Sequence, residues 1–462
     1  MQPPFDIPAD LDTPVSAWLK LAAFRPRFLL ESVEGAERLA RYSFLGFGDA
    51  VEVALDGDTW RAGGETRAAP RTTAELLESL RAALRLAPRF EDVPPGVPLA
   101  GGLVGVLGYD LVRRFETVHS RPPARSAGEP ELRLVGTTGL LVFDHLTRRA
   151  ALLTAGDGAA RRGLRADVIG ALRGPVSADG RRRRLGPPAA SLDRAAFAGG
   201  VERVRRAILD GEVYQLVLSV RSEGECEVPP FEVYRALRLL NPSPYMYYLD
   251  FGDLQVVGSS PEALVRLEGR EAALRPIAGT RPRGGDDDRD LQLERELLAD
   301  PKESAEHVML VDLARNDLGR VAQPGSVRVE PSRIVERYSH VMHLVSGVRG
   351  VLAPDRDAFD LLAATFPAGT VVGAPKVRAM ELIDELEPVG RGLYAGTVGY
   401  FGRGGSMDQA IAIRTLTFRE GRYAYQAGAG IVSDSDPARE HDEVRSKSAV
   451  LARALELAAG GL

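Results

Sequence analysis

The sequence predicts a mixed α+β (α/β) fold in which many neighbouring strands pair in antiparallel fashion. Up to about residue 157, short apolar runs bounded by Gly, Pro and Asp predict strands. After residue 191, predicted helices alternate with predicted strands, and several strands follow one another with no helix between them. Parallel neighbours need a crossover connection, so we expect these strand pairs to be antiparallel.

Residues 1–155 form the predicted N-terminal domain, with one helix expected at residues 73–86. Its strands are expected in the runs RFLLESV, RYSFLGFG, VEVAL, GGLVGVLGYDLV and TTGLLVFDH. Residues 156–192 are rich in Gly, Ala, Arg and Pro, and we interpret them as a linker with one helix at residues 161–172. The arginine run at 181–184 is interpreted as solvated linker and not as a phosphate-binding patch, because no aromatic residue interrupts it.

Residues 193–462 form the predicted second domain, in which helices and strands alternate. Helices are expected at 193–209, 231–240, 300–315, 357–364 and 376–386. Strands are expected at 213–221, 245–251, 254–260, 262–268, 338–348, 393–401, 407–418 and 422–427.

The C-terminal stretch 426–454 joins a glycine-broken strand end to a long helix with Asp436 as its expected N-cap. Glu440, Glu443 and Lys447 follow at helical spacings and so share one face. Just upstream, the small residues Gly428, Ala429 and Gly430 let a ligand approach backbone amides. This pattern fits a divalent metal that holds an anionic ligand, and it also fits a solvated helix face whose charges pair with each other.

A second acidic helix carries Glu303 and Glu306 on one face. Spacing alone does not show that the two acidic helices meet, and surface glutamates are far commoner than metal ligands. If the helices do meet, a set of carboxylate oxygens suits Mg²⁺, which keeps several waters and takes substrate oxygens as further ligands.

The overall composition points to a small soluble substrate. The chain has 462 residues, 44% of them hydrophobic, and a net charge of -5, whereas nucleic-acid binding needs a dense cationic surface. One cysteine, Cys226, allows no disulfide within the chain, and no apolar run reaches the ~20 residues of a membrane span. The N-terminal residues lack the basic start and apolar stretch of a signal peptide, so we expect a cytoplasmic protein.

Seven motifs follow one another from residue 276 onward: PIAGTRPRG (276–284), ESAEHVMLVDLARNDLG (303–319), YSHVMHLVS (338–346), FPAGTVVGAPK (366–376), GLYAGTVGYF (392–401), MDQAIAIRT (407–415) and AGAGIVSDSDP (427–437). In this order they resemble the chorismate-utilising enzymes, and most of all the large subunits of anthranilate synthase. The resemblance covers nearly all of residues 195–455 and extends to LLES (29–32), RYSFLG (41–46) and NPSPYM (241–246). It implies an antiparallel-rich β-sandwich with outer helices, a regulatory N-terminal domain and a chorismate-binding catalytic domain.

Carried over to matching positions, the resemblance implies roles for particular residues. It implies that Glu306 and Glu443 hold Mg²⁺, with Glu303 and Glu440 nearby. Glu262 is the implied acid or base toward the departing C4 hydroxyl, His343 the catalytic histidine, and Thr370 a hydrogen-bonding group. The implied substrate-binding groups are Gly279, Thr280, Tyr394, Arg414, Gly428, Ala429, Gly430 and Lys447.

Two positions select among the reactions of this family. Ala278 stands where many aminodeoxychorismate synthases carry an attacking lysine, and Gln215 where isochorismate and salicylate synthases carry a lysine that activates water. Both point to amination of chorismate by ammonia, giving anthranilate and pyruvate in the first step of tryptophan biosynthesis. Cys226 lies in GECEVPP and not in a glutaminase nucleophile turn, so we expect a separate glutamine amidotransferase subunit, component II, and a hetero-oligomer.

Two alternatives and one regulatory expectation remain at this point. The chain also fits aminodeoxychorismate synthase component I of the folate pathway, since some of those enzymes lack the lysine. A non-catalytic amino-acid sensor would need only LLES and NPSPYM, but the retained Glu262, His343 and acidic helices weigh against it. The resemblance implies feedback inhibition by L-tryptophan, bound by Ser32, Pro244, Tyr245 and Met246.

Overall fold

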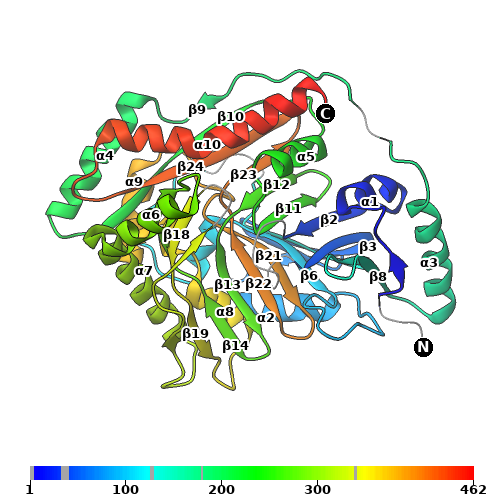
Figure 1. The fold of residues 1–462 in the computed structure, drawn as a ribbon. Helices are drawn as coiled ribbons and strands as arrows, with labels where there is room; N and C mark the ends of the chain where they lie inside the picture. The colour runs from blue at the N-terminus through cyan, green and yellow to red at the C-terminus, as the bar shows by residue number, and fades with distance from the viewer. Residues whose placement is uncertain (1–4, 33–40, 125–128, 178–179, 338–340) are drawn as a thin grey trace.

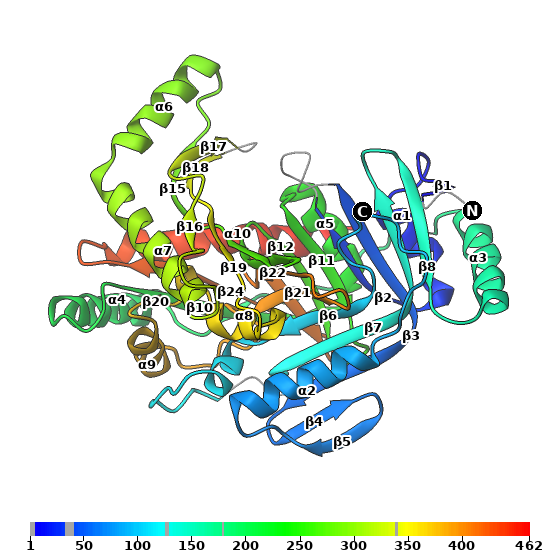
Figure 2. The same cartoon turned by 90° about the horizontal axis from the view of Figure 1, so that it is seen from below.

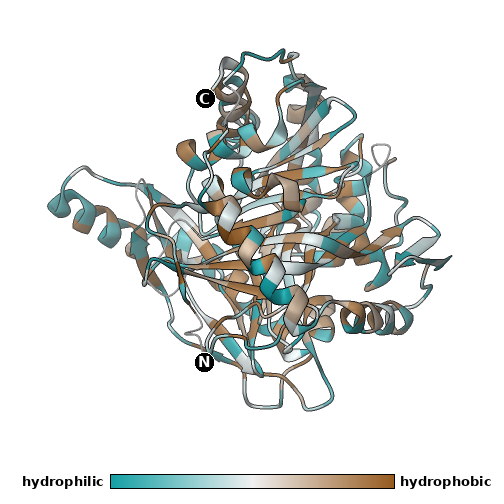
Figure 3. Cartoon of the chain, turned by 90° about the vertical axis from the view of Figure 1, so that its right-hand side faces the viewer, coloured by the Kyte–Doolittle hydropathy of each residue, from teal (hydrophilic) through white to brown (hydrophobic). Residues whose placement is uncertain are grey.

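An antiparallel β-structure forms the centre of the molecule, and helices lie around its outside (Figure 1). The structure is a computed structural model, and it describes residues 5–32, 41–124, 129–177, 180–337 and 341–462. Hydrophobic segments concentrate in the central strands, and hydrophilic residues lie mainly on outer helices and loops (Figure 3).

The described residues up to Ala190 contain nine strands, three α-helices and two short 3-10 helices. The strands are β1 (Ile7–Pro8), β2 (Pro26–Glu31), β3 (Tyr42–Asp56), β4 (Thr59–Ala62), β5 (Glu65–Ala68), β6 (Gly102–Leu107), β7 (Leu132–Asp144), β8 (Arg149–Thr154) and β9 (Ala189–Ala190). The helical elements are α1 (Pro14–Lys20), η1 (Ala22–Phe24), α2 (Thr73–Leu86), η2 (Tyr109–Arg114) and α3 (Gly158–Leu172).

The remaining chain alternates helices with strand pairs. The helical elements are α4 (Arg194–Leu209), α5 (Pro230–Leu240), α6 (Asp287–Ala299), α7 (Pro301–Gly319), α8 (Ala358–Thr365), η3 (Gly369–Val371), α9 (Lys376–Leu386) and α10 (Pro437–Gly460). The strands are β10 (Gln215–Glu225), β11 (Tyr245–Asp250), β12 (Gln255–Ser260), β13 (Ala263–Glu268), β14 (Glu271–Leu274), β15 (Ile277–Pro282), β16 (Arg328–Val329), β17 (Ile334–Arg337), β18 (Val341–Val345), β19 (Val348–Val351), β20 (Gly373–Ala374), β21 (Thr397–Gly402), β22 (Met407–Ile411), β23 (Thr415–Arg419) and β24 (Arg422–Ile431).

The large sheet curls so that two halves face each other. One half runs β10–β24–β23–β12–β11–β2, and the other runs β6–β21–β22–β13–β14–β19. The long strands β3 and β7 pair with each other and join the two halves, with a change of register between Phe47 and Ala50. Strand bulges of this kind bend a sheet and increase its twist, as closing a sandwich requires.

Apolar side chains fill the space between the halves and the space under the helices. Phe28, Val106, Val135, Tyr247 and Val398 belong to the cluster between the halves. The helices α5 and α10 cover the half that contains β10 and β24, and Leu451 and Leu455 of α10 are buried there. Burial of this apolar face, and not intrinsic helix propensity, stabilises most of such a helix.

A small sheet projects from this body. It has the strand order β15–β18–β17, and α6 and α7 lie beside it. Figure 2 shows α6 extending away from the sandwich together with these strands. Candidate site residues on these strands therefore lie on a different side of the molecule's centre than those on the large sheet.

Most expected elements are confirmed, and several bounds differ. The helices α2 and α9 have the predicted bounds, and α4, α7, α8 and α10 begin directly after Asp193, Asp300, Asp357 and Asp436, whose side chains cap them. The predicted strands RYSFLGFG and VEVAL form the single strand β3, and the run GYDLV is η2 and not strand. The predicted helix 161–172 begins at Gly158, because Asp157 caps it. The helices α1 and α6 were not predicted.

Two predicted strands are interrupted at or next to candidate site residues. The predicted strand 407–418 is two strands, because the chain turns between them and Arg414 adopts φ 49°. Of the predicted strand 393–401, residues up to Gly396 form a turn in which Ala395 has φ 63°. Residues 338–340 of the predicted strand 338–348 lie outside the described residues, and β18 covers Val341–Val345.

The N-terminal and C-terminal regions share one hydrogen-bonded sheet. Strand β2 pairs with β11, and β6 pairs with β21. Whether residues 156–192 separate independently folding domains stays a prediction. Among the helices in the described part of the chain, none has the length and hydropathy needed to cross a bilayer.

Candidate active site

Glu262 lies at the centre of the predicted site, in the turn between β12 and β13. The hydroxyl of Thr370 in η3 donates to Glu262 Oε1 at 3.0 Å, and Ile411 N–H donates to the Glu262 backbone oxygen at 3.0 Å. Burial raises the pKa of Glu262 to about 7, although the Thr370 hydrogen bond and the positive charges of Lys447 and Arg414 lower it in part. Such a carboxyl can donate or accept a proton near neutral pH.

Arg414 supplies positive charge beside this carboxyl. Its left-handed backbone turns the chain between β22 and β23, and its carbonyl accepts from Ser259 N–H at 3.1 Å. The side chain is half-buried, and burial lowers the pKa of its guanidinium while Glu262 raises it. Arg414 makes no ion pair with the part of the chain that the structure describes. A partly desolvated guanidinium of this kind suits a carboxylate of a bound substrate.

His343 on β18 enters from the small sheet. Its Nδ1 lies 3.0 Å from the carbonyl oxygen of Gly279. A carbonyl only accepts, so Nδ1 carries the proton and the neutral ring has its lone pair on Nε2. Burial and the nearby Arg414 lower the pKa of His343, which favours this neutral form.

The backbone around Gly279 requires glycine. Gly279 lies at a register shift of β15 with φ 62°, and an added Cβ would come 2.8 Å from Leu297 Cδ1 and 3.0 Å from Glu303 Oε2. The backbone of Thr280 pairs with His343, but its side chain lies outside what the structure describes. The predicted substrate contacts of Gly279 and Thr280 therefore lie next to the histidine.

The glycine-rich end of β24 offers two backbone amides and not three. Val217 N–H donates to Val372 O at 2.8 Å and Ser219 N–H to Glu387 Oε1 at 2.9 Å, so both turn away from β24. Because neighbouring residues alternate, Leu218 faces β24, and its register partner Ala429 bonds within the ladder. This corrects the expectation for Ala429: only Gly428 and Gly430 direct their backbone groups away from β10.

Two predicted substrate-binding side chains lie against these glycines. A Cβ on Gly428 would come 2.7 Å from the Tyr394 hydroxyl, and burial raises the pKa of Tyr394 to about 12, which keeps that hydroxyl a hydrogen-bond donor. Lys447 Nζ donates to the carbonyl of Gly428 at 3.1 Å and pairs with Glu443 Oε1 at 2.7 Å. Lys447 therefore contacts both the backbone of the glycine-rich strand end and the acidic face of α10.

The acidic faces of α7 and α10 are close enough for their carboxylates to interact electrostatically. Burial and the neighbouring charges of Glu303 and Glu443 raise the pKa of Glu306. Burial and Glu443 raise the pKa of Glu440, which the hydrogen bond from Ser435 lowers. Because Glu443 on α10 contributes to the raised pKa of Glu306 on α7, the two helices bring like charges together, and a divalent cation would relieve their repulsion.

Two of the four candidate metal ligands already have a cationic partner. Arg281 donates to Glu303 at 2.9 Å and Lys447 pairs with Glu443 at 2.7 Å, so these contacts do not rank one carboxylate above the other. Lys302 pairs with Asp434 at 3.0 Å and ties the start of α7 to the loop before α10. Within the described ranges, no three His, Cys, Asp or Glu side chains converge as ligands. Two carboxylates completed by water and substrate oxygens are a normal arrangement for Mg²⁺.

Some contacts of the site were not predicted from the sequence. Arg281 lies inside a recognised motif, but only the fold brings it to Glu303. Lys376 forms a buried pair with Asp317 at 2.9 Å and joins α9 to α7. Cys226 is buried, and its thiol lies 3.8 Å from the Val228 carbonyl oxygen.

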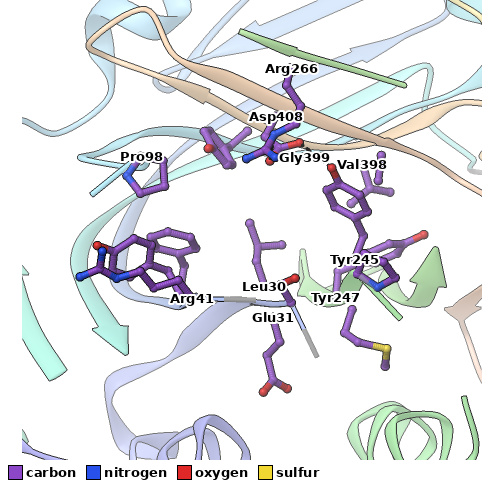
Figure 4. Close-up of a pocket in the computed structure, with 17 residues that line it drawn as sticks. Leu30, Glu31, Arg41, Pro98, Tyr245, Tyr247, Arg266, Val398, Gly399 and Asp408 are labelled. Atoms are coloured by element: carbon purple, nitrogen blue, oxygen red, sulfur yellow. Dashed lines mark hydrogen bonds and ion pairs between the residues drawn. The ribbon is translucent and has the colours of Figure 1, made fainter. Parts of the chain in front are cut away.

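A pocket that Glu262 does not line lies between β2, β11, β21 and β22 (Figure 4). The predicted tryptophan-binding residues Ser32, Pro244, Tyr245 and Met246 all line it. In the described part of the chain, the Ser32 hydroxyl has no hydrogen-bond partner. Arg266 and Asp408 lie side by side on one wall and pair at 3.0 Å, and the Tyr245 hydroxyl donates to Asp408 at 3.1 Å.

Comparison with known proteins gives a consistent set of similarities. The family described as chorismate binding enzyme matches residues 25–453. Anthranilate synthase component 1 of Thermus thermophilus is 46% identical, over 98% of this chain and 97% of that protein. The crystal structure of anthranilate synthase component I from Streptococcus pneumoniae superposes with a TM-score of 0.80 at 35% identity, over 89% of this chain and 92% of the other. The menaquinone-specific isochorismate synthase of Escherichia coli shares the fold, with a TM-score of 0.71 at 22% identity over 96% and 92% of the two chains.

Proposed function

Because the chain belongs to the chorismate binding enzymes, and within them to anthranilate synthase component 1, we propose that it converts chorismate and ammonia to anthranilate and pyruvate. This is a lyase reaction of tryptophan biosynthesis. The observation that carries the proposal is the convergence of Glu262, Arg414 and His343, each with an altered pKa, beside two open glycine amides. The relatives' names do not favour the folate-pathway alternative.

In the first step, ammonia attacks C2 of chorismate and the C4 hydroxyl leaves. Glu262 in its protonated form gives its proton to that hydroxyl, which departs as water, and Thr370 holds the carboxyl by its hydrogen bond. Ammonia is already nucleophilic, so no base is needed to activate it. Gln215 fits this assignment: it lies against Gly430, where an added Cβ would be 2.5 Å from Gln215 Nε2, and an amide cannot act as a base.

In the second step, the C2 hydrogen is removed as a proton, the C3–O bond breaks and the ring becomes aromatic. The enolpyruvate that leaves then takes up a proton and becomes pyruvate. The lone pair of His343 Nε2 is suited to take the C2 proton, because the Gly279 carbonyl fixes the proton on Nδ1. Ala278, buried beside Gly279, offers no nucleophile that could attack the ring.

The substrate is a dicarboxylate, and the site offers separate partners for its two anionic groups. Arg414, Tyr394 and the amides of Gly428 and Gly430 suit one carboxylate. Glu306 and Glu443 would hold Mg²⁺, with Glu303 and Glu440 around them, and the bound ion supplies positive charge to the other carboxylate. Lys447 lies between the two sets through its contacts with Gly428 and Glu443.

We further propose that ammonia reaches this chain from glutamine through a separate amidotransferase subunit. The name component 1, which the relatives carry, implies a partner component. The one cysteine of this chain is buried beside Val228, and burial raises the pKa of its thiol, which does not suit a nucleophile.

The pocket of Figure 4 is the proposed site of feedback inhibition by L-tryptophan. Pro244, Tyr245 and Met246 offer surfaces that pack on an indole ring, and the unpartnered Ser32 hydroxyl offers a hydrogen bond to the zwitterion. Ala410 of β22 lines the pocket, and the next residue, Ile411, donates to the Glu262 backbone. Tryptophan and chorismate binding are therefore expected to be coupled.

The test is a product assay with the purified chain, chorismate, Mg²⁺ and an ammonium salt. Anthranilate and pyruvate are expected in equal amounts, and glutamine should replace ammonium only when the partner subunit is added. Formation of aminodeoxychorismate without anthranilate would overturn the proposed reaction. Efficient use of glutamine by the isolated chain would overturn the two-subunit arrangement.

A further inference from the structure

A fully buried ion pair lies directly behind the candidate active site. Arg391 and Glu387 are side by side, and their side chains are only 1% and 2% exposed. Arg391 Nε donates to Glu387 Oε2 at 2.9 Å and Nη2 donates to Oε1 at 2.7 Å. Charges are costly to bury, and this pair is compensated by a two-pronged contact and by further hydrogen bonds.

The remaining donors of Arg391 hold two segments that carry functional groups. Nη1 donates to the carbonyl of Val371 at 2.7 Å, and Val371 directly follows Thr370. Nη2 also donates to the carbonyl of Val217 at 2.8 Å, and Val217 is the register partner of Gly430. One guanidinium therefore fixes the loop of Thr370 against the strand that backs the glycine amides.

The pair also contacts the groups around Gly428. The Arg391 guanidinium lies over the Tyr394 ring, 5.4 Å from its centre, and Tyr394 N–H donates to the Arg391 carbonyl at 3.0 Å. Glu387 Oε1 accepts from the backbone and the hydroxyl of Ser219, at 2.9 and 2.6 Å. Ser219 is the register partner of Gly428.

We propose that Arg391 and Glu387 are positioning residues, which hold Thr370 and its partner Glu262 in register with Tyr394, Gly428 and Gly430. Arg391 is too buried to touch substrate, and it acts through the segments it bonds. The proposal rests on the proposed function, since it assigns the geometry that this chemistry needs. Displacements of about 1 Å in such a site reduce rates by up to about a hundredfold.

Only an arginine can make this set of bonds. Its planar fork directs donors at a carboxylate and at two carbonyls on different sides, whereas a lysine concentrates its donors on a single nitrogen. Arg391→Lys keeps the positive charge but loses the simultaneous hold on Val371 and Val217. Glu262 should then lose part of its contact with Thr370.

The chain offers a matched control in Arg114. Arg114 Nε and Nη2 donate to Glu131 at 3.1 and 3.4 Å, and its nitrogens also donate to the carbonyls of Pro70 and Gly57 at 2.8 and 2.9 Å. This is the same pattern of one carboxylate and two carbonyls, in a place with no contact to the candidate site. Arg114→Lys measures what the loss of such a pattern costs in folding alone.

The experiment compares Arg391→Lys and Arg114→Lys in the full chain, with ammonia-dependent anthranilate formation and thermal unfolding as readouts. For Arg391→Lys we expect kcat to fall about ten- to a hundredfold. We also expect the high-pH limb of kcat/KM to move upward, because the Thr370 hydrogen bond that lowers the Glu262 pKa is weakened. Arg114→Lys should keep wild-type kcat and pH profile, whatever its unfolding temperature.

The outcomes separate the two proposals. If wild-type protein forms no anthranilate, the proposed function fails. If wild-type protein is active and Arg391→Lys keeps its kcat and its pH limb, the positioning role fails. Ser219→Ala gives a second measurement should Arg391→Lys not fold, since it removes one donor to Glu387 and keeps the backbone bond. A smaller shift of the pH limb in the same direction supports the proposal, and an unmoved limb overturns it.

Discussion

The candidate active site and the pocket of Figure 4 differ in how their charges are satisfied. In the active site, Glu262 has one hydroxyl donor and a raised pKa, and Arg414 makes no ion pair with the described residues. In the pocket, burial also raises the pKa of Asp408, but Arg266 and Tyr245 contact it directly.

A second carboxylate that lines the pocket, Glu31, also has charged and polar partners. Arg238 donates to both oxygens of Glu31 at 3.0 and 3.2 Å, and Tyr234 donates to one of them. Because the charged groups of the pocket already have partners, we expect the pocket to bind a ligand by its shape and by a few other polar groups, such as the Ser32 hydroxyl. In the candidate active site, Glu262 has a pKa of about 7 and can change protonation during a reaction, and the guanidinium of Arg414 can pair with a substrate carboxylate. The contrast predicts that substitutions in the two regions have separable effects.

The largest effect is expected from Glu262→Gln. The amide keeps the shape but cannot give a proton, so anthranilate formation should fall about 10²- to 10⁴-fold, while tryptophan binding measured by calorimetry should persist. In wild-type protein the acid form is required, so kcat/KM should decrease as pH rises through the Glu262 pKa of about 7. Glu268→Gln, an exposed change at the end of β13, the strand that follows Glu262, is the control. A Glu262→Gln enzyme with wild-type rate would remove Glu262 from the mechanism.

His343→Ala should slow pyruvate elimination more than amination, by about 10²-fold, because the second step needs a base for the C2 proton. Chromatography with mass detection should reveal accumulated aminodeoxyisochorismate. His145→Ala, which removes a ring bonded to Ser43 away from the site, should leave the product ratio unchanged. Equal slowing of both steps would make His343 a binding group and not the elimination base.

Glu306→Gln and Glu443→Gln should each weaken Mg²⁺ about 10- to 100-fold, because each removes one negative charge from the proposed ligand set. Direct calorimetric titration of Mg²⁺ into the protein gives a readout that does not depend on turnover. Glu456→Gln, an exposed change near the end of α10, serves as the control. Mg²⁺ titrations identical to wild type in both variants would contradict the assignment of these ligands.

The smallest effect on catalysis is expected from Ser32→Phe, which fills the pocket without touching the active site. Tryptophan inhibition should weaken at least about tenfold while kcat stays near the wild-type value. Reciprocity requires that chorismate and tryptophan weaken each other's binding by the same factor. Full tryptophan inhibition in this variant, or tryptophan affinity that chorismate does not change, would place the inhibitor elsewhere.

Sequence motifs identified most of the side chains of the site but not the backbone arrangement that makes them useful. Glu262, His343 and Arg414 were named from motifs, and the structure brings them together. The left-handed turn at Arg414 was read as continuous strand, because the apolar pattern of residues 407–418 has no glycine or proline to mark it. Ala429 was grouped with its glycine neighbours because sequence does not tell which amides face a partner strand.

Contacts between segments that are far apart in the sequence could not be predicted, for a different reason. Arg391 and Glu387 are four positions apart in the segment that follows α9, where no helical spacing predicts that they pair. Their importance arises from Val217 and Val371, whose carbonyls come from other elements. The helix α6 is not predicted because its sequence is strongly polar, and its two buried leucines, Leu293 and Leu297, give only a weak helical pattern of apolar residues.

The pairing of β2 with β11 and of β6 with β21 bears on how the chain folds during synthesis. Met246 of β11 pairs with Glu31 of β2, and Phe401 of β21 pairs with Leu103 of β6. The strands β2 and β6 are therefore synthesised long before these partner strands. Until then their unpaired edges are templates for association with other chains. We expect folding to complete only after β21 has emerged, and nascent chains that stop before Thr397 to require chaperones to remain unaggregated.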